Sequence, residues 1–151
     1  KQMTIILALD IGTECGLAVG HTNMMLSRDL ASIDRRKADA PRRMACILDE
    51  IATAARPDRI VYCAPTMRRA SGKRRAPEAV LVRAVRDWAA DNGIECVPVS
   101  NGDVKKAFTG DGNASALSVL SEAERRGFLP SGMAEARAIA VFHHSLLGAA
   151  G

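Results

Sequence analysis

The segment from Leu9 to Val19, LDIGTECGLAV, decides the fold. It continues the apolar, β-branched run TIILALD at 4–10, so Asp10 stands at the end of a strand that we predict to be buried. A glycine-containing turn then leads into a second strand, which sets the Asp10 carboxylate at the sheet edge, where the backbone can approach a phosphate group or a metal ion. A carboxylate at an apolar strand end is costly without a partner. The simpler alternative is that Asp10 only caps the turn.

Strand and helix patterns alternate along the rest of the chain. Apolar, β-branched runs separated by glycine or proline predict five strands, at 4–10, 16–20, 24–30, 59–64 and 94–100. Helical periods predict a helix from Pro41 that ends at Pro57, a second from Pro77 to Asn92, and three more over 102–108, 113–126 and 131–147. Pro98 favours an edge position for the last strand. This order predicts an α/β fold with a five-stranded mixed sheet, whose first three strands form an antiparallel meander, and with helices on both faces.

Length and charge narrow the class of protein. The chain has 151 residues and is 48% hydrophobic, which suffices for one buried core and is too short for two ordinary domains. We therefore expect a single domain over 1–151. Lysine and arginine number 21 against 17 acidic residues, and the resulting net charge of +4 favours an anionic partner.

The cysteines point to a reducing compartment. Cys15, Cys46, Cys63 and Cys96 have no zinc-ligand spacing. Cys46 and Cys96 lie inside apolar patterns, so we expect small buried thiols there. The sequence contains neither a continuous apolar run of membrane-spanning length nor a signal-peptide profile at its start. We therefore expect a cytoplasmic protein.

Three segments, in the expected order, resemble the RuvC-like Holliday junction resolvases of the ribonuclease H-like superfamily. The first is the turn at 9–19. The second is NGDVKKAFTGDGNASALSVL at 101–120, which resembles their Val-Lys-Lys helix, Thr-Gly turn and Gly-x-Ala step; the third, ARAIAVFHHSLLG at 136–148, resembles their last helix. The turn alone also resembles actin-like sugar kinases, but these need two such domains around the nucleotide. YqgF-type relatives match the second segment less well.

The resemblance implies a nuclease site of four carboxylates around two Mg²⁺ or Mn²⁺ ions, which would activate water at a phosphodiester. Asp10 matches the first carboxylate. Cys63 stands where the family has a glutamate at the tip of the fourth strand, and Ala134 and Arg137 stand at the two acidic positions of the last helix. Glu135, between them, is the acid that remains, and it points about 100° round the helix from Ala134.

These replacements predict a degenerate site. A thiolate is a poor ligand for Mg²⁺, so we interpret Cys63 as a small buried side chain. Arg137 could neutralise Asp10 or hold a phosphate. We expect weak or no metal binding at Asp10, and little or no cleavage. The first alternative is an active Mg²⁺- or Mn²⁺-dependent junction endonuclease that uses Asp10 and Glu135, helped by Glu14 or Asp111; the second is a dimeric scaffold that does not bind DNA.

Basic residues predict the binding partner. The densest positive cluster follows the fourth strand and so projects from the same sheet edge as Asp10; its members are Arg68, Arg69, Lys73, Arg74 and Arg75. By the resemblance, Lys105 and Lys106 match positions that approach the DNA backbone, whereas Ala116 replaces a further lysine. We therefore expect a homodimer that binds branched or junction DNA mainly through its phosphates.

Overall fold

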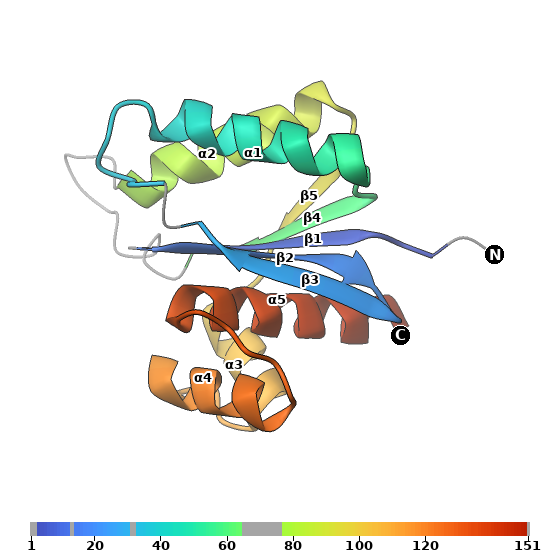
Figure 1. Cartoon of the computed structure of the whole chain (residues 1–151), viewed down its shortest axis with the longest axis vertical. Coiled ribbons are helices and arrows are strands. Elements are labelled where there is room, and N and C mark those ends of the chain that lie inside the picture. The colour runs from blue at the N-terminus through green and yellow to red at the C-terminus, as the bar shows by residue number, and fades with distance from the viewer. Residues whose placement is uncertain (1–2, 13, 31–32, 65–76, 151) are drawn as a thin grey trace.

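The computed structural model describes residues 3–12, 14–30, 33–64 and 77–150. Five strands form one mixed sheet in the order β3-β2-β1-β4-β5 (Figure 1). They are β1 (Ile6–Ile11), β2 (Cys15–His21), β3 (Met24–Asp29), β4 (Arg59–Cys63) and β5 (Glu95–Pro98). The first three strands pair antiparallel, whereas β4 runs parallel to β1 and β5 runs parallel to β4. The predicted meander, the mixed sheet and the edge position of Pro98 are all confirmed.

Helices cover both faces of this sheet, as predicted (Figure 1). On one face lie α1 (Ala40–Ala54) and α2 (Pro77–Asp91). On the other lies α5 (Met133–Ala150), and α3 (Asn101–Thr109) and α4 (Ala116–Arg125) pack against it. No helix in the described part of the chain is long and apolar enough to cross a membrane.

The alternation of side chains along β1 explains the two cores. Leu7, Leu9 and Ile11 belong to the cluster under α1 and α2, whereas Ile6 and Ala8 belong to the cluster under α5. Small residues let α5 approach the sheet closely. A Cβ atom on Gly16 would lie 2.2 Å from the carbonyl oxygen of Ala134, so the first turn of α5 can rest on β2 only because residue 16 is glycine.

Two sequence expectations need correction. Cys46 is exposed on α1, because Met44, Ile47 and Leu48 occupy the face of the helix that packs on the sheet. The helix expected over 113–126 begins at Ala116. Its start is delayed because Ser115 caps it by accepting a hydrogen bond from the backbone N–H of Ser118.

Candidate functional site

Four strands present one row of residues at the candidate site. Asp10 on β1 pairs with Cys63 on β4 and with Gly16 on β2, and Gly16 pairs in turn with Asp29 on β3. Asp10 and Cys63 therefore lie side by side at the carboxyl ends of two parallel strands. In α/β sheets this edge is where ligands commonly bind.

Asp10 is paired with Arg137. The Asp10 side chain is 1% exposed, and its Oδ2 accepts a hydrogen bond of 2.9 Å from Nε of Arg137, whose side chain is 21% exposed. Burial raises the pKa of Asp10 to about 6, although the charge and hydrogen bond of Arg137 act in the opposite direction. Of the two roles that the sequence left open for Arg137, the structure shows the contact with Asp10.

Cys63 is a buried neutral thiol. It is 2% exposed, and its Sγ lies 4.0 Å from Oδ1 of Asn101 at the start of α3. Burial, and then the neighbouring Asp10 charge, raise the pKa of Cys63 to about 12. A thiol with such a pKa is protonated at neutral pH, and a protonated thiol is neither a nucleophile nor a ligand of the hard-oxygen kind that Mg²⁺ needs.

Glu135 is held elsewhere. Its carboxylate accepts hydrogen bonds from Ser27 Oγ at 2.7 Å, from Ser131 Oγ at 2.8 Å and from the Ser131 backbone N–H at 3.1 Å. Burial acts to raise the pKa of Glu135, but these bonds together outweigh it and hold the pKa below its usual range. Ser27 lies on β3, two strands from β1, and two strand spacings are about 10 Å. The structure thus does not bring Glu135 to Asp10, and Ala134 lies buried where α5 crosses Gly16.

Of the predicted DNA-binding residues, the structure describes Lys105 and Lys106. Lys105 on α3 is half-buried and close enough to Cys63 for its charge to act on the pKa of that thiol. Lys106 is exposed beside the turn at Gly110, whose N–H donates to the Lys106 carbonyl. The cluster of Arg68, Arg69, Lys73, Arg74 and Arg75 lies outside the described residues.

The residues at this edge do not fit a pair of divalent metal ions. Mg²⁺ and Mn²⁺ need several hard oxygen ligands, and here one buried carboxylate already faces a guanidinium. Among the described residues no group of three or more His, Cys, Asp or Glu side chains is placed to hold an ion. Glu14 is exposed, and the Asp111 carboxylate accepts a hydrogen bond from the N–H of Asn113. The described side chains at this edge carry both signs of charge: Arg137 and Lys105 are partly exposed, Asp29 is partly exposed and Glu14 is exposed.

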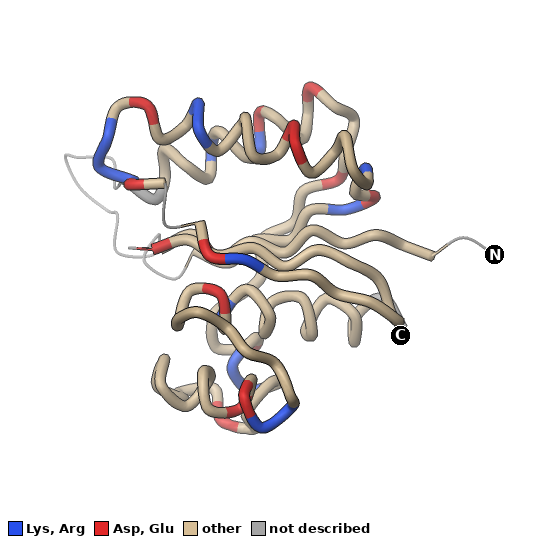
Figure 2. Tube along the Cα trace, viewed as in Figure 1, with Lys and Arg blue, Asp and Glu red and all other residues tan. Residues whose placement is uncertain are grey.

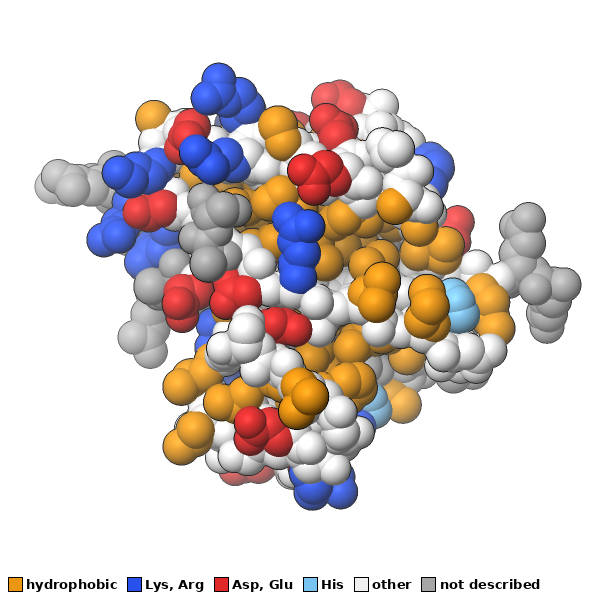
Figure 3. Space-filling model, in the orientation of Figure 1, with side chains coloured by type: hydrophobic (Ala, Val, Ile, Leu, Met, Phe, Trp, Pro, Cys, Tyr) orange, Lys and Arg blue, Asp and Glu red, His pale blue; other side chains and the backbone are white. Residues whose placement is uncertain are grey.

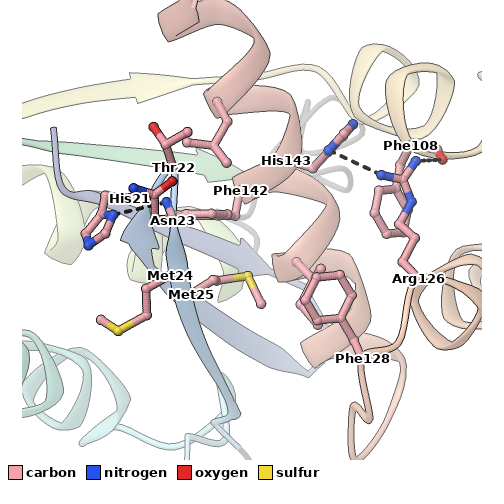
Figure 4. A pocket seen from close by; sticks show the side chains of 12 residues that line it. His21, Thr22, Asn23, Met24, Met25, Phe108, Arg126, Phe128, Phe142 and His143 are labelled. Atoms are coloured by element: carbon pink, nitrogen blue, oxygen red, sulfur yellow. Dashed lines mark hydrogen bonds between the residues drawn. The ribbon is translucent and has the colours of Figure 1, made fainter. Parts of the chain in front are cut away.

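A cavity of about 260 Å³ lies at the opposite end of the sheet, beside the β2–β3 hairpin (Figure 4). Its lining is mainly apolar, with Met25, Phe128 and Phe142 among its members. The cation in it, Arg126, is already engaged, because it donates to Glu122 and to the Phe108 carbonyl and lies over the Phe108 ring. Among the described residues that line this cavity, the one arginine is thus already bound within the protein, which makes the cavity a weaker candidate for an anionic ligand than the strand-tip site.

Comparison with solved structures defines the fold. Thermus thermophilus RuvC in complex with a Holliday junction substrate superposes with a TM-score of 0.69 at 20% identity, covering 97% of this chain and 97% of that one. Thermus thermophilus RuvC alone gives 0.62 at 21% identity over 96% and 97% of the two chains. The yeast mitochondrial Holliday junction resolvase Ydc2 gives 0.64 at 8% identity over 95% of this chain and 78% of that one.

These likenesses define a ribonuclease H-like α/β fold. Within that class the arrangement is RuvC-like along nearly the whole chain, as the three sequence segments implied. No protein-family profile and no curated protein sequence matches the chain. The structure therefore defines the fold, whereas the strand-tip site has Cys63, Ala134 and Arg137 at positions where the resemblance implied acids.

Sequence reasoning missed the partners of the acids. Ser131 and Glu135 bracket the start of α5, and a serine before a first-turn glutamate is a common helix-capping arrangement, so this pair had a local signal. Ser27 had none, because it is 108 residues away from Glu135 in the chain. Asn101 was likewise placed beside Cys63 only by the fold.

Proposed function

We propose that this protein binds branched or four-way-junction DNA without cutting it, at the sheet edge where β1 and β4 end. The observation that carries the proposal is the ion pair between Asp10 and Arg137 within a RuvC-like fold. The guanidinium stands beside the carboxylate that metal-dependent cleavage would require. Positive charge at that position favours a phosphate and disfavours a metal cation.

The other acids support the same conclusion. Two-metal cleavage needs carboxylates gathered around ions about 4 Å apart. Cys63 is uncharged, and Glu135 is bound by Ser27 and Ser131 over β3. The cations remain available, since Lys105 and Lys106 lie on α3, which begins at this edge beside Cys63. Binding through cations alone is expected to depend steeply on salt and weakly on sequence.

The test uses a labelled four-way junction and a linear duplex of the same composition. Binding is measured by fluorescence anisotropy over a series of salt concentrations, and cleavage is assayed with Mg²⁺ and with Mn²⁺. We expect binding that favours the junction and no specific nicks with either ion. Specific nicks that vanish in Asp10→Asn would establish the active endonuclease instead. Absence of junction binding even at low ionic strength would leave the scaffold hypothesis.

The proposal includes a homodimer, which would offer two such edges to the arms of one junction. Light scattering coupled to size-exclusion chromatography measures the mass directly, with and without DNA. A mass of twice the chain is expected in both conditions. A monomer that stays a monomer on the junction would remove this part of the proposal and leave the single binding edge intact.

A further inference from the structure

The connection between β3 and α1 carries a second group of cations. We name residues 34–43, DRRKADAPRR, the 34–43 segment. It contains five cations and two acids, Asp34 and Asp39; the cations are Arg35, Arg36, Lys37, Arg42 and Arg43. These cations are not part of the strand-tip site described above.

This segment leaves the sheet at the candidate site. β3 ends at Asp29, in the same row as Gly16 and Asp10, and the next residue, Leu30, donates its N–H to the Cys15 carbonyl. In Figure 2 the basic part of the connection lies at the same end of the molecule as the tips of β1 and β2. Lysine and arginine side chains gather on that side in the space-filling view as well (Figure 3).

The backbone of the segment is well anchored. Lys37 N–H donates to the Asp34 carbonyl at 2.9 Å, and Ala40 N–H donates to the Lys37 carbonyl at 3.1 Å. Ile33, just before the segment, is 3% exposed, and Ala40 is 1% exposed, so both ends of the turn are buried in the core. The cations therefore project from an ordered turn, which lowers the entropic cost of ordering them on a ligand.

Each acid of the segment forms an ion pair with a neighbouring arginine. Arg36 pairs with Asp34 at 3.1 Å, and Arg43 pairs with Asp39 at 2.8 Å. Lys37 and Arg42 are exposed, and the segment contains no third acid for them. The net positive charge of the segment thus comes from several side chains of the turn.

Two cations of the segment lie in the first turn of α1. Its first turn contains Pro41, Arg42 and Arg43 and no acid. The side chain of the N-cap residue Asp39 makes no capping hydrogen bond and binds Arg43 instead. Cations at the positive end of a helix dipole are unfavourable, and an anion bound there would relieve this repulsion.

We propose that the 34–43 segment is a second phosphate-binding surface, which holds the backbone of a duplex arm of the same DNA that the strand-tip edge binds. This inference rests on the proposed function. Its chemistry is that of cations contacting phosphates, so the surface adds affinity and fixes the direction of the arm without reading bases. It also gives the molecule contacts on the α1 side of the sheet, opposite the α3 lysines.

The experiment compares two double variants with the same loss of charge. Lys37→Ala/Arg42→Ala removes two exposed cations that the segment's acids do not bind. Arg59→Ala/Arg125→Ala is the control, because Arg59 begins β4 at the opposite sheet edge and Arg125 ends α4. The association constant for the four-way junction is measured against salt for both variants and for the unmodified protein, and circular dichroism checks the fold.

We expect the log–log salt slope to fall in magnitude by about 2 in Lys37→Ala/Arg42→Ala, with affinity roughly 50-fold weaker near 0.1 M salt. The control is expected to keep most of the slope. If the unmodified protein binds and the two variants change equally, or neither changes, the second surface is rejected while the proposed function stands. If the unmodified protein does not bind at all, both fail.

Discussion

Asp10 contacts α5 and Glu135 lies on it, and both acids are buried. Their pKa values nevertheless shift in opposite directions. Asp10 has one cationic partner, Arg137, and burial still raises its pKa to about 6. Glu135 is bound by the two serines Ser27 and Ser131 without any cation, and its pKa is held below the usual range. Asp10 is the more deeply buried of the two, at 1% exposed against 8% for Glu135, so desolvation outweighs the contact with Arg137 at Asp10, whereas three hydrogen bonds outweigh it at Glu135.

The difference gives the two acids opposite effects on stability as pH changes. For Asp10 the folded-state pKa lies above the unfolded value of 3.8, so ionisation costs stability progressively as pH rises through about 6. For Glu135 the folded-state pKa lies below 4.5, so its contribution is present at neutral pH and is lost as pH falls through the folded-state pKa. Variants that remove one partner at a time test this contrast.

Removal of Arg137 is expected to have the largest effect. Arg137→Ala leaves Asp10 buried without its partner, which should destabilise the protein by about 3 kcal/mol at pH 8, a limit set by the cost of protonating a carboxyl of pKa about 6 at that pH. At pH 5 Asp10 is protonated in both proteins, so most of the loss should disappear. Urea unfolding at the two pH values measures this. Arg83→Ala, which breaks an exposed pair with Asp87, is the control and should cost less than about 1 kcal/mol.

A loss for Arg137→Ala that is equal at pH 5 and pH 8 would show that packing, not the Asp10 charge, is responsible. The double variant Asp10→Ala/Arg137→Ala separates these causes. If the ion pair matters, it should be more stable at pH 8 than Arg137→Ala alone, because the unpaired buried charge has gone.

The next largest effect is expected for a substitution of Gly16, whose lack of a Cβ atom lets α5 lie close to β2. A Cβ atom there would meet the Ala134 carbonyl at 2.2 Å, and backbone must move to accommodate it. Gly16→Ala should therefore destabilise by about 3 kcal/mol. Gly148→Ala is a matched control, because no atom lies within 4 Å of the added Cβ on this helical residue. Thermal unfolding of both variants would reveal equal effects if the close approach were unimportant.

The sequence predicted the sheet well for local reasons. Glycine breaks between the β-branched runs predicted the meander, and the alternation with helices predicted parallel β4 and β5. The neighbourhood of Asp10 and Cys63 followed from strand topology, and the position of Arg137 followed from the resemblance of the last helix to that of RuvC-like proteins. All of these depend on periodicity or on short connections.

What could not be predicted depends on contacts between distant segments. Ser27 reaches Glu135 only because β3 lies under the start of α5, and no local pattern connects them. Cys46 looked buried because its neighbours are apolar, yet exposure depends on which helix face meets the sheet. The sequence alone assigns no role to the basic connection 34–43, since its place beside the strand tips arises from the β2–β3 pairing.

A smaller effect is expected from Ser27. Ser27→Ala removes a 2.7 Å hydrogen bond to the charged Glu135, so we expect a loss of about 2 kcal/mol at pH 7. The loss should shrink as pH falls from the ordinary glutamate value of 4.5 through the lowered folded-state pKa of Glu135. Ser145→Ala is the control, because its hydroxyl bonds to the Val141 carbonyl, which does not titrate. Urea unfolding at pH 7 and pH 3.5 compares them, and a parallel pH response in both variants would contradict a charged Glu135.

The last variant, Asp10→Asn, should stabilise the protein at pH 8 instead of destabilising it, and it bears most directly on function. The amide has the same shape, and its oxygen can still accept from Arg137 Nε, while the costly buried charge is gone. Stability should become less sensitive to pH between 4 and 8, so Asp10→Asn should gain stability relative to the unmodified protein as pH rises through about 6. Junction affinity should stay the same or rise slightly, because Arg137 loses its counter-charge beside the phosphate. An acid that held catalytic metal would behave otherwise: its replacement would abolish cleavage and weaken any Mg²⁺-dependent component of binding. The same variant, measured for unfolding and for binding with and without Mg²⁺, therefore distinguishes an internal counter-ion from a ligand.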